Sequence, residues 1–432
     1  MPSVTELHSI LKSSKLKTEF ELLYGLSGKN IDKQIARYKR LINEFKAHFG
    51  DSDLSLFSTP GRTEIGGNHT DHNHGRVLAG SVNLDSVAVA VPIDEAKITM
   101  YSEGFDAPFI VNLNELNVKE DEKGTTTSLI RGIAARFNEL GYEIGGFNAF
   151  ISSDVLVGSG LSSSASIEVL IGSILNGFYN DSRISPTEIA IIGQFAENNY
   201  FGKPCGLMDQ TACAVGGIVT IDFADPQEPI VKKVDFDFAS QNYSLIVVDT
   251  GGSHADLTDD YASIPTEMKA VSRELGVAVA RELKMDDVVE NIEKLRNKVG
   301  DRAILRVIHF LGDNERVVEQ VEALEHGEFQ LFLRMVTESG NSSNKWLQNC
   351  YTIKDPAEQG VNLALALSER FIHHIGQGAC RVHGGGFAGT IQIFIPNENV
   401  NDYVKMMRPI FGESSVYVLS IRPVGCYQFK LQ

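Results

Sequence analysis

The chain has 432 residues, of which 43% are hydrophobic and 22% charged, and its formal net charge is −17. This length exceeds what one hydrophobic core usually covers, so we expect two domains with a cleft between them. The acidity, with no run of Lys and Arg, argues against nucleic acid as a partner. No apolar run reaches the roughly 18 residues of a membrane span, and the N-terminal segment has the pattern of an amphipathic helix and not of a signal peptide.

The five cysteines are scattered and contain no CxxC pair. An odd number without such spacing argues against a disulfide framework and against a zinc site. The sequence therefore predicts reduced thiols in a cytoplasmic protein without a membrane or nucleic-acid partner, and we expect a monomer.

An N-terminal domain is expected over residues 20–240, because helical and β-rich patterns alternate there without a regular βαβ repeat. Ser185 and Pro186 predict the start of one of its helices, as cap and first residue. The other expected elements are, in chain order, a helix at 29–49, strands at 54–67, 75–94 and 97–104, a helix at 127–141, a strand at 145–155, a helix that ends near Phe178, and a strand at 216–225.

The polar stretch "DFDFASQNYS" marks a change of domain near residue 240. A second domain is expected over 241–414, with helices at 301–322 and 326–338 and a glycine-rich turn that leads into a strand at 380–396. The last segment, from about 415 to 432, alternates like a strand and is compatible with a return to the first domain.

The stretch "VGSGLSSSASIEVL", residues 157–170, lies between a β-like segment and an apolar-periodic helix. Glycines let several backbone N–H groups point inward, serine hydroxyls add donors, and the start of the next helix adds the positive end of its dipole. The pattern predicts an anion-binding loop without the lysine of a Walker motif. A plain structural turn ahead of a helix is the alternative.

Four blocks resemble the GHMP kinases in the order that this family has them. "GSGLSSSAS" resembles the family's central motif, and "PGRTEIGGNHTDHNHG" (60–75) resembles the galactokinase signature GRxNxIGEHxDYxxG. "GKPCGLMDQTACAVGG" (202–217) is similar to the segment that holds the catalytic aspartate of galactokinases, and "RVHGGGFAGTIQIFI" (381–395) resembles the third, glycine-rich motif.

The resemblance implies an α+β, two-domain GHMP kinase fold: a ribosomal-S5-domain-2-like N-terminal domain, a ferredoxin-like C-terminal domain and an active site in the cleft between them. It implies an ATP- and Mg²⁺-dependent phosphorylation of galactose at its 1-hydroxyl, with galactose and Mg-ATP as partners. The catalytic residues would be Asp209 and Arg62, with Ser164 and Glu197 as magnesium ligands. The implied ATP-phosphate contacts are Gly158, Ser159, Gly160, Leu161, Ser162, Ser163 and Ser164, and the implied sugar contacts are Asn68, His69, Thr70, Asp71, Gly206 and Tyr261.

Several of these residues also have an alternative role that does not depend on the family resemblance. Asp209 has the place of a helix N-cap, Glu197 that of a solvated helix carboxylate, and Tyr261 that of a core tyrosine. "NHTDHNH" has the residue types of a metal site. Asn68 also stands in place of the signature's glutamate, and His72 in place of its tyrosine. The rival functions are a related kinase of N-acetylgalactosamine, arabinose or mevalonate, and a sugar and ATP sensor without turnover.

Overall fold

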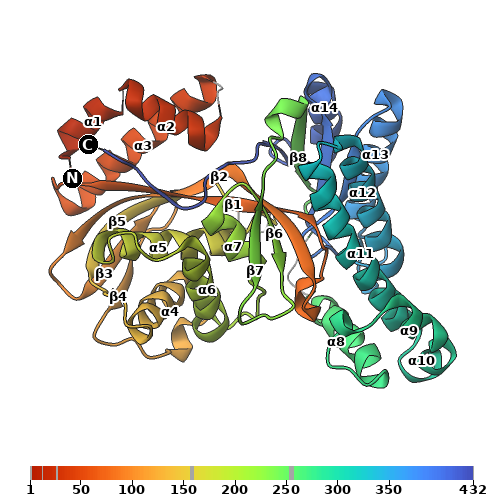
Figure 1. Cartoon of the computed structure of the whole chain (residues 1–432). Coiled ribbons are helices and arrows are strands. Elements are labelled where there is room, and N and C mark those ends of the chain that lie inside the picture. Colours follow the sequence, from red (N-terminus) through yellow and green to blue (C-terminus); the bar gives the residue numbers. More distant parts are fainter. Residues whose placement is uncertain (1, 12, 26–27, 156–159, 253–256, 432) are drawn as a thin grey trace.

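The computed structural model describes residues 2–11, 13–25, 28–155, 160–252 and 257–431. Figure 1 shows two sheets that lie side by side, and each sheet has its own set of helices. Strands β1 and β2 of the first sheet extend to the helices of the second part, where α11 contacts both. The two parts are therefore joined along the ends of these strands.

The first sheet has eight strands within the described residues, with β12, β1, β2, β5, β3 and β4 in order and β6 and β7 branching from β2. Helices α1 to α3 lie on one face and α4 to α7 on the other (Figure 1). The bounds are α1 Val4–Ile10, α2 Ser14–Tyr24, α3 Gly28–Phe49, β1 Ser55–Gly66, β2 Arg76–Ile93, β3 Lys97–Ser102, β4 Phe109–Asn112, α4 Thr126–Glu139, β5 Gly146–Ser153, α5 Ser163–Tyr179, α6 Pro186–Ala196, α7 Met208–Val215, β6 Ile218–Asp222, β7 Ile230–Val234 and β12 Tyr427–Gln428.

The second sheet has four strands within the described residues, in the order β11, β8, β10 and β9, all antiparallel. The chain crosses from β7 of the first sheet to β8 of the second over residues 235–242. The bounds are β8 Tyr243–Asp249, α8 Thr258–Glu274, α9 Met285–Glu290, α10 Ile292–Lys298, α11 Asp301–Glu325, α12 Phe329–Ser342, α13 Gly360–Ile375, β9 Ala379–His383, β10 Thr390–Pro396, α14 Val400–Phe411 and β11 Val416–Leu419.

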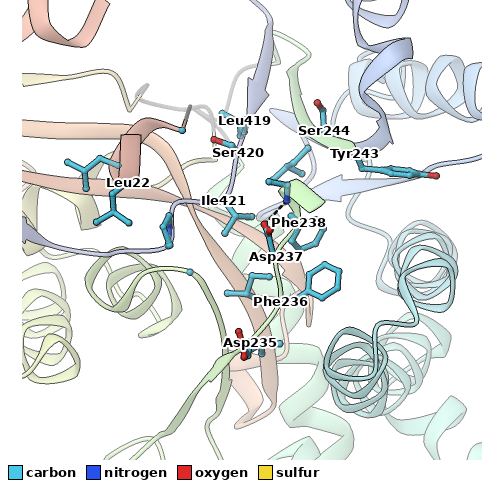
Figure 2. A pocket seen from close by; sticks show the side chains of 18 of the residues that line it. Leu22, Asp235, Phe236, Asp237, Phe238, Tyr243, Ser244, Leu419, Ser420 and Ile421 are labelled. Carbon is cyan, nitrogen blue, oxygen red and sulfur yellow. Dashed lines mark hydrogen bonds between the residues drawn. The ribbon is translucent and has the colours of Figure 1, made fainter. Parts of the chain in front are cut away.

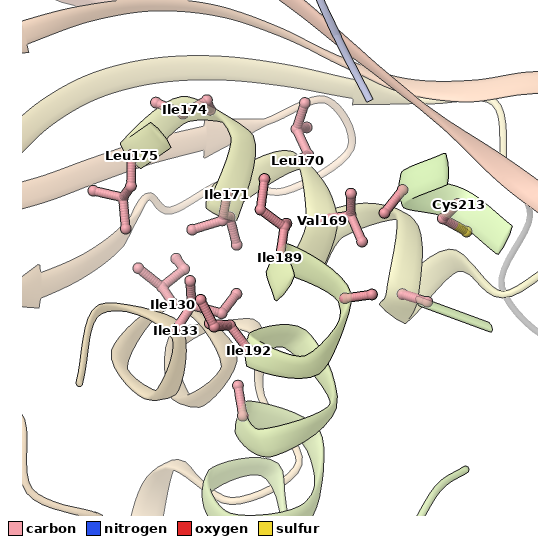
Figure 3. Packing of buried hydrophobic residues seen from close by; sticks show 14 of the residues in the cluster. Ile130, Ile133, Val169, Leu170, Ile171, Ile174, Leu175, Ile189, Ile192 and Cys213 are labelled. Atoms are coloured by element: carbon pink, nitrogen blue, oxygen red, sulfur yellow. The ribbon is translucent and has the colours of Figure 1, made fainter. Parts of the chain in front are cut away.

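Helices α4, α5 and α6 bury an aliphatic cluster against the first sheet (Figure 3). Ile133 of α4, Val169 of α5 and Ile192 of α6 are all fully buried in it. Burial of each such side chain stabilises the fold by about 1.5–3 kcal/mol. Because α5 begins at Ser163, this packing also fixes where the Gly/Ser loop ends.

A buried carboxylate, Asp85 of β2, joins both ends of the chain to the first sheet. Arg37 of α3 lies 2.7 Å from Asp85 Oδ1, and Arg422 of the C-terminal segment lies 3.2 Å from Asp85 Oδ2. The Tyr24 hydroxyl donates to the same carboxylate at 2.5 Å. A buried charge with two cations and further donors is well compensated. Removing it would leave Arg422 without this carboxylate and Arg37 with Asp154, at 3.3 Å, in its place.

Of two expectations for the ends of the chain, the structure changes the first and bears out the second in part. The N-terminal amphipathic segment forms two helices, α1 and α2, and not one. The second helix begins after Ser13, whose side chain caps α2 by accepting from Leu16 N at 3.2 Å. The segment 415–432 is divided, since β11 pairs with β8 in the second sheet and β12 pairs with β1 in the first. The other expected helix start is confirmed, because the Ser185 side chain caps α6 with Pro186 in its first turn.

A cavity of about 810 Å³ opens where the chain crosses between the two sheets (Figure 2). Leu22 of α2, Phe236 and Phe238 of the crossing segment, and Ile421 line it. Its lining includes none of the residues that the sequence predicts for substrate, ATP or metal. The candidate site therefore lies elsewhere.

Candidate active site

Arg62 and Asp209 form a two-point ion pair at the centre of the candidate site. Arg62 lies on β1 and Asp209 in the first turn of α7, and the guanidinium donates to the carboxylate through Nε at 2.7 Å and Nη2 at 2.8 Å. The sequence separates these residues by 147 positions. The fold thus brings together the two residues that the resemblance names as catalytic. Asp209 does not cap α7, because Leu207 holds the N-cap position.

The Gly/Ser loop meets this pair at the N-terminus of α5. Ser162 has a left-handed backbone with φ of 60°, and its hydroxyl donates to Asp209. Arg62 Nη1 donates to the carbonyl oxygen of Gly160, and Arg62 N donates to Leu161 O at 3.0 Å. Gly158 and Ser159 lie outside the described residues. In the described part of the loop, Gly160 to Ser164, the helix N-terminus faces the Arg62–Asp209 pair.

The surroundings of Asp209 hold it as an anion. Burial alone would raise its pKa, but the charge of Arg62 and the hydrogen bonds from Arg62 and Ser162 outweigh this effect, so the pKa lies below its ordinary value. An anion so stabilised is a weak base and a strong hydrogen-bond acceptor. Asp209 is therefore suited to orient a hydroxyl group more than to remove its proton early.

A second group of polar side chains surrounds Glu197, in the turn η3 (Glu197–Phe201) that follows α6. The Ser164 hydroxyl donates to Glu197 Oε1 at 3.1 Å, and Lys203 Nζ reaches the same oxygen at 3.1 Å. Gln210 Nε2 donates to Glu197 Oε2 at 2.8 Å and to the buried carboxylate of Glu168 at 2.9 Å. The two expected magnesium ligands are thus in contact, and Glu197 is buried instead of solvated.

The Ser164 hydroxyl and the Glu197 carboxylate fit a cation that binds together with phosphate. A hydroxyl and a carboxylate are ligands that Mg²⁺ accepts, and Mg²⁺ keeps the remaining positions for water and phosphate oxygens. Within the described residues, no three His, Cys, Asp or Glu side chains converge as a self-sufficient metal site requires. The histidines of "NHTDHNH" therefore do not form such a site there.

Two expected sugar contacts on the loop at 68–71 differ in exposure, since Asp71 is partly exposed and His69 is buried. Asp71 Oδ1 accepts from the backbone of His72 at 2.9 Å, while a Cβ on Gly206 would lie 2.3 Å from Asp71 Oδ2. Glycine at position 206 is thus what lets the segment before α7 approach Asp71. His69 Nε2 bonds to Gly385 O at 2.8 Å, and burial, followed by the nearby His72, lowers the pKa of His69 to about 4.

Two further expected sugar contacts have structural partners. The Thr70 hydroxyl donates to Gly67 O at 2.8 Å and so supports the turn of the loop. The Tyr261 hydroxyl, on α8, donates to Gly386 O at 2.9 Å. Tyr261 and His69 therefore hold the glycine turn at 384–386 from two sides.

Asn68 is the expected sugar contact that the fold places differently. Its side chain is fully buried, and protein groups occupy both its donor and its acceptor end. A side chain whose hydrogen bonds are already made inside the protein has none free for a sugar hydroxyl. In this arrangement Asn68 belongs to the contact between the two domains and not to the sugar site.

Two models of protein families match parts of the chain. The GHMP kinases N terminal domain matches residues 128–217, which include the Gly/Ser loop and Asp209. The galactokinase galactose-binding signature matches residues 43–92, which include Arg62 and the loop at 68–71. Parts of the chain thus match the N-terminal domain of the GHMP kinases and the sugar-binding signature of galactokinases.

The chain is similar to galactokinases over most of its length. It is 29% identical over 371 residues to the galactokinase of Glaesserella parasuis serovar 5, covering 84% of this chain and 91% of the relative. It is 27% identical over 385 residues to that of Lactobacillus helveticus, covering 88% and 95%. Both alignments are longer than either of the two expected domains.

Solved structures of GHMP kinases share the fold. The Lactococcus lactis galactokinase complexed with galactose matches with a TM-score of 0.75 at 24% identity, covering 89% of this chain and 98% of that one. A mevalonate kinase matches with a TM-score of 0.60 at 18% identity, covering 85% and 98%. The expected two-domain α+β GHMP kinase fold is confirmed.

Three groups near the site were not predicted from the sequence. Lys203 pairs with Glu197, Gln210 joins Glu197 to Glu168, and His383 lies against β1, where its Nε2 accepts from Glu64 N at 3.3 Å. Lys203 and Gln210 stand within the same motif as Asp209, so their proximity could have been expected from the sequence. Nothing in the sequence connects His383 with β1.

Proposed function

We propose that this chain is a galactokinase, which transfers the γ-phosphoryl group of ATP to the 1-hydroxyl of α-D-galactose. The observation that carries the proposal is the Arg62–Asp209 pair at the N-terminus of α5. It combines an anion acceptor for a hydroxyl, a cation for a transferring phosphoryl group, and backbone donors for phosphate. The galactose-binding signature that matches residues 43–92 supports galactose as the acceptor.

In the proposed reaction the galactose 1-hydroxyl oxygen attacks the γ-phosphorus, the bond between γ-phosphorus and the leaving oxygen of ADP breaks, and the hydroxyl proton leaves to Asp209 or to water. Phosphoryl transfer has a loose transition state, so positioning and charge neutralisation contribute more than early proton removal. Asp209 would orient the hydroxyl, and Arg62 would stabilise the charge that builds on the transferring group. The low pKa of Asp209 agrees with this division of roles.

The proposed phosphate contacts are the N–H groups and hydroxyls of Gly158 to Ser164, because the start of α5 carries free N–H groups and the positive end of a helix dipole. Ser164 and Glu197 are the proposed magnesium ligands. Mg²⁺ bound there with ATP would neutralise phosphate charge. Lys203, which contacts Glu197 now, would then be free to turn toward phosphate.

The proposed sugar contacts are Asp71, His69, Thr70, Gly206 and Tyr261. Asp71 is the only one of them with a carboxylate, and hydrogen bonds to a charged acceptor are about twice as strong as neutral ones. Asp71 is therefore expected to dominate sugar binding, through two neighbouring hydroxyls of the ring.

The proposed setting is a cytoplasmic monomer, since ATP is the phosphoryl donor and the described cysteines are unpaired. None of the described helices is long and apolar enough to span a membrane.

The proposal is tested by measuring ADP release with Mg-ATP and a panel of acceptors: galactose, glucose, N-acetylgalactosamine, arabinose and mevalonate. We expect the highest kcat/KM on galactose and a product phosphorylated at position 1 by phosphorus NMR. A higher kcat/KM on N-acetylgalactosamine or arabinose would assign a different acceptor to the same site. Galactose binding without ADP release would favour a sensor instead of an enzyme.

A further inference from the structure

The Asn68 side chain fills its hydrogen-bonding capacity inside the protein. Its Nδ2 donates to Glu64 Oε1 at 2.9 Å and to Gly384 O at 2.7 Å. Its Oδ1 accepts from Ser343 Oγ at 3.2 Å and from Asn349 Nδ2 at 2.8 Å. A primary amide offers two donors and two acceptor positions, so these four bonds use all of them. Three of the four partners come from the second domain.

The Glu64 carboxylate has one oxygen that serves both domains. Oε1 accepts from Asn68 Nδ2 and, at 2.7 Å, from Nη2 of Arg381 on β9. Arg381 also donates through Nη1 to Ile65 O at 2.8 Å, and its side chain is fully buried. Because the amide and the guanidinium share one oxygen, a carboxylate placed at position 68 would lie within reach of the same guanidinium.

The signature GRxNxIGEHxDYxxG explains what is unusual about this pair. It has asparagine at the position of Glu64 and glutamate at the position of Asn68, so this chain carries the two residue types in exchanged places. Between them, Gly66 stands in place of isoleucine, and a Cβ there would lie 2.0 Å from Oε1 of Gln320 on α11. At all three positions a side chain of the second domain occupies the contact.

We propose, on the basis of the galactokinase function above, that Glu64 and Asn68 are a positioning pair that fixes the sugar loop at 69–71 to the glycine turn at 384–386. The carboxylate that the signature places at position 68 acts here from position 64, through Arg381, and does not touch the sugar. His69 and Tyr261, which bond to Gly385 O and Gly386 O, complete the attachment. Sugar affinity then depends on this domain contact in addition to Asp71.

The test is a charge exchange with four proteins: wild type, Glu64→Asn, Asn68→Glu and the double variant. Glu64→Asn leaves Arg381 without a carboxylate, and Asn68→Glu sets two carboxylates beside one guanidinium. The double variant restores one carboxylate and one amide. We expect each single change to raise KM for galactose about tenfold with KM for ATP nearly unchanged, and the double variant to return within about threefold of wild type.

Two readouts need neither substrate nor turnover. Trp346 is the chain's single tryptophan and lies in η6 (Ser343–Leu347), between Ser343 and Asn349, the two residues that bond to Asn68 Oδ1. We expect its emission and the thermal midpoint to change in each single variant and to recover in the double variant. Glu95→Asn, which removes an exposed carboxylate paired with Lys97 at 3.1 Å, is the matched control and should change neither.

A double variant as impaired as the worse single variant, in KM for galactose, emission and midpoint, would show that positions 64 and 68 act independently and would overturn the proposal. Recovery of emission and midpoint without recovery of KM would reduce the pair to a structural contact and overturn its role in sugar binding. If the wild-type protein failed to phosphorylate galactose, the proposed function would be wrong, but that result alone would not decide the positioning role. Galactose binding measured by calorimetry on the same four proteins would then decide the positioning role.

Discussion

The phosphate side and the sugar side of the site are built in different ways. On the phosphate side, Arg62, Ser162 and Asp209 contact one another within the first domain, and each matches the motif that predicted it. On the sugar side, the loop at 68–71 is held by the glycine turn and by α8 of the second domain. The contacts on the phosphate side position the catalytic residues within the first domain alone. The contacts on the sugar side join the two domains, so sugar binding depends on how the domains meet.

Asp209→Asn should have the largest effect and break the phosphate side alone. The amide keeps the shape of the carboxylate but loses the charge that pairs with Arg62 and orients the hydroxyl, so we expect kcat to fall at least about 10³-fold. Galactose binding, measured by calorimetry, should change by less than about threefold. The exposed Asp402→Asn is the matched control. A kcat within tenfold of wild type would remove Asp209 from the reaction.

Glu197→Gln should follow, with kcat reduced about 10²-fold and a higher Mg²⁺ concentration needed for half-maximal rate, because an amide is a weaker ligand than a carboxylate. Glu168→Gln is the matched comparison. Burial, together with the charge of Glu197, holds the pKa of Glu168 well above its ordinary value, so its neutral form is favoured and an amide replaces it closely. ADP release across a Mg²⁺ titration measures both. Equal Mg²⁺ requirements in the two variants would contradict the assignment of Glu197.

His383 makes the domain contact sensitive to pH. Burial, followed by the charges of Arg62 and Arg381, holds the pKa of His383 well below its ordinary value. Its contribution to stability is therefore complete above the unfolded pKa of about 6.5 and is lost as the pH falls below it, because only the unfolded chain takes up the proton.

Between pH 6.5 and 5, the free energy of unfolding of wild type should fall about 1 kcal/mol per pH unit more steeply than that of His383→Gln. Urea unfolding at each pH measures the difference, and His69 and His309 remain in both proteins. His373→Gln, an exposed site on α13, is the matched control and should keep the wild-type slope. The same slope in His383→Gln would mean that His383 is protonated in the folded protein.

Tyr261→Phe should have the smallest effect and should act on the sugar side only. It removes the hydroxyl that donates to Gly386 O, a bond whose net value is about 1 kcal/mol. We expect KM for galactose to rise about fivefold with kcat nearly unchanged. Tyr243→Phe removes a hydroxyl that donates to Gln377 at 3.0 Å outside the site, and should leave KM at its wild-type value. A fall in kcat without a change in KM would place Tyr261 on the phosphate side instead.

The sequence predicts the phosphate side better than the sugar side for a physical reason. Ser162, Ser164 and Asp209 stand in motifs whose local geometry, a loop before a helix, already determines their place. The elements around them follow from periodicity and caps, as with Ser185 and α6.

The contacts of the Asn68 and Glu64 side chains with the second domain depend instead on residues 275 to 317 positions away. No local pattern specifies such a pairing, and comparison with the signature one position at a time shows only that Asn68 replaces a glutamate. The compensating glutamate is visible four residues earlier in the sequence, but its partner Arg381 is apparent only in the fold. In the same way, alternation at 415–432 predicts strands and does not tell which sheet each one joins.

The carboxylate of Asp85, with Arg37 before it in the chain and Arg422 near the end, has a consequence for biosynthesis. The first sheet receives its edge strand β12 and one of the two guanidinium partners from residues 422–432, which follow the second domain in the chain. During translation these residues are made only after the second domain. Arg422 and strand β12 can therefore join Asp85 and β1 only once the second domain has been made.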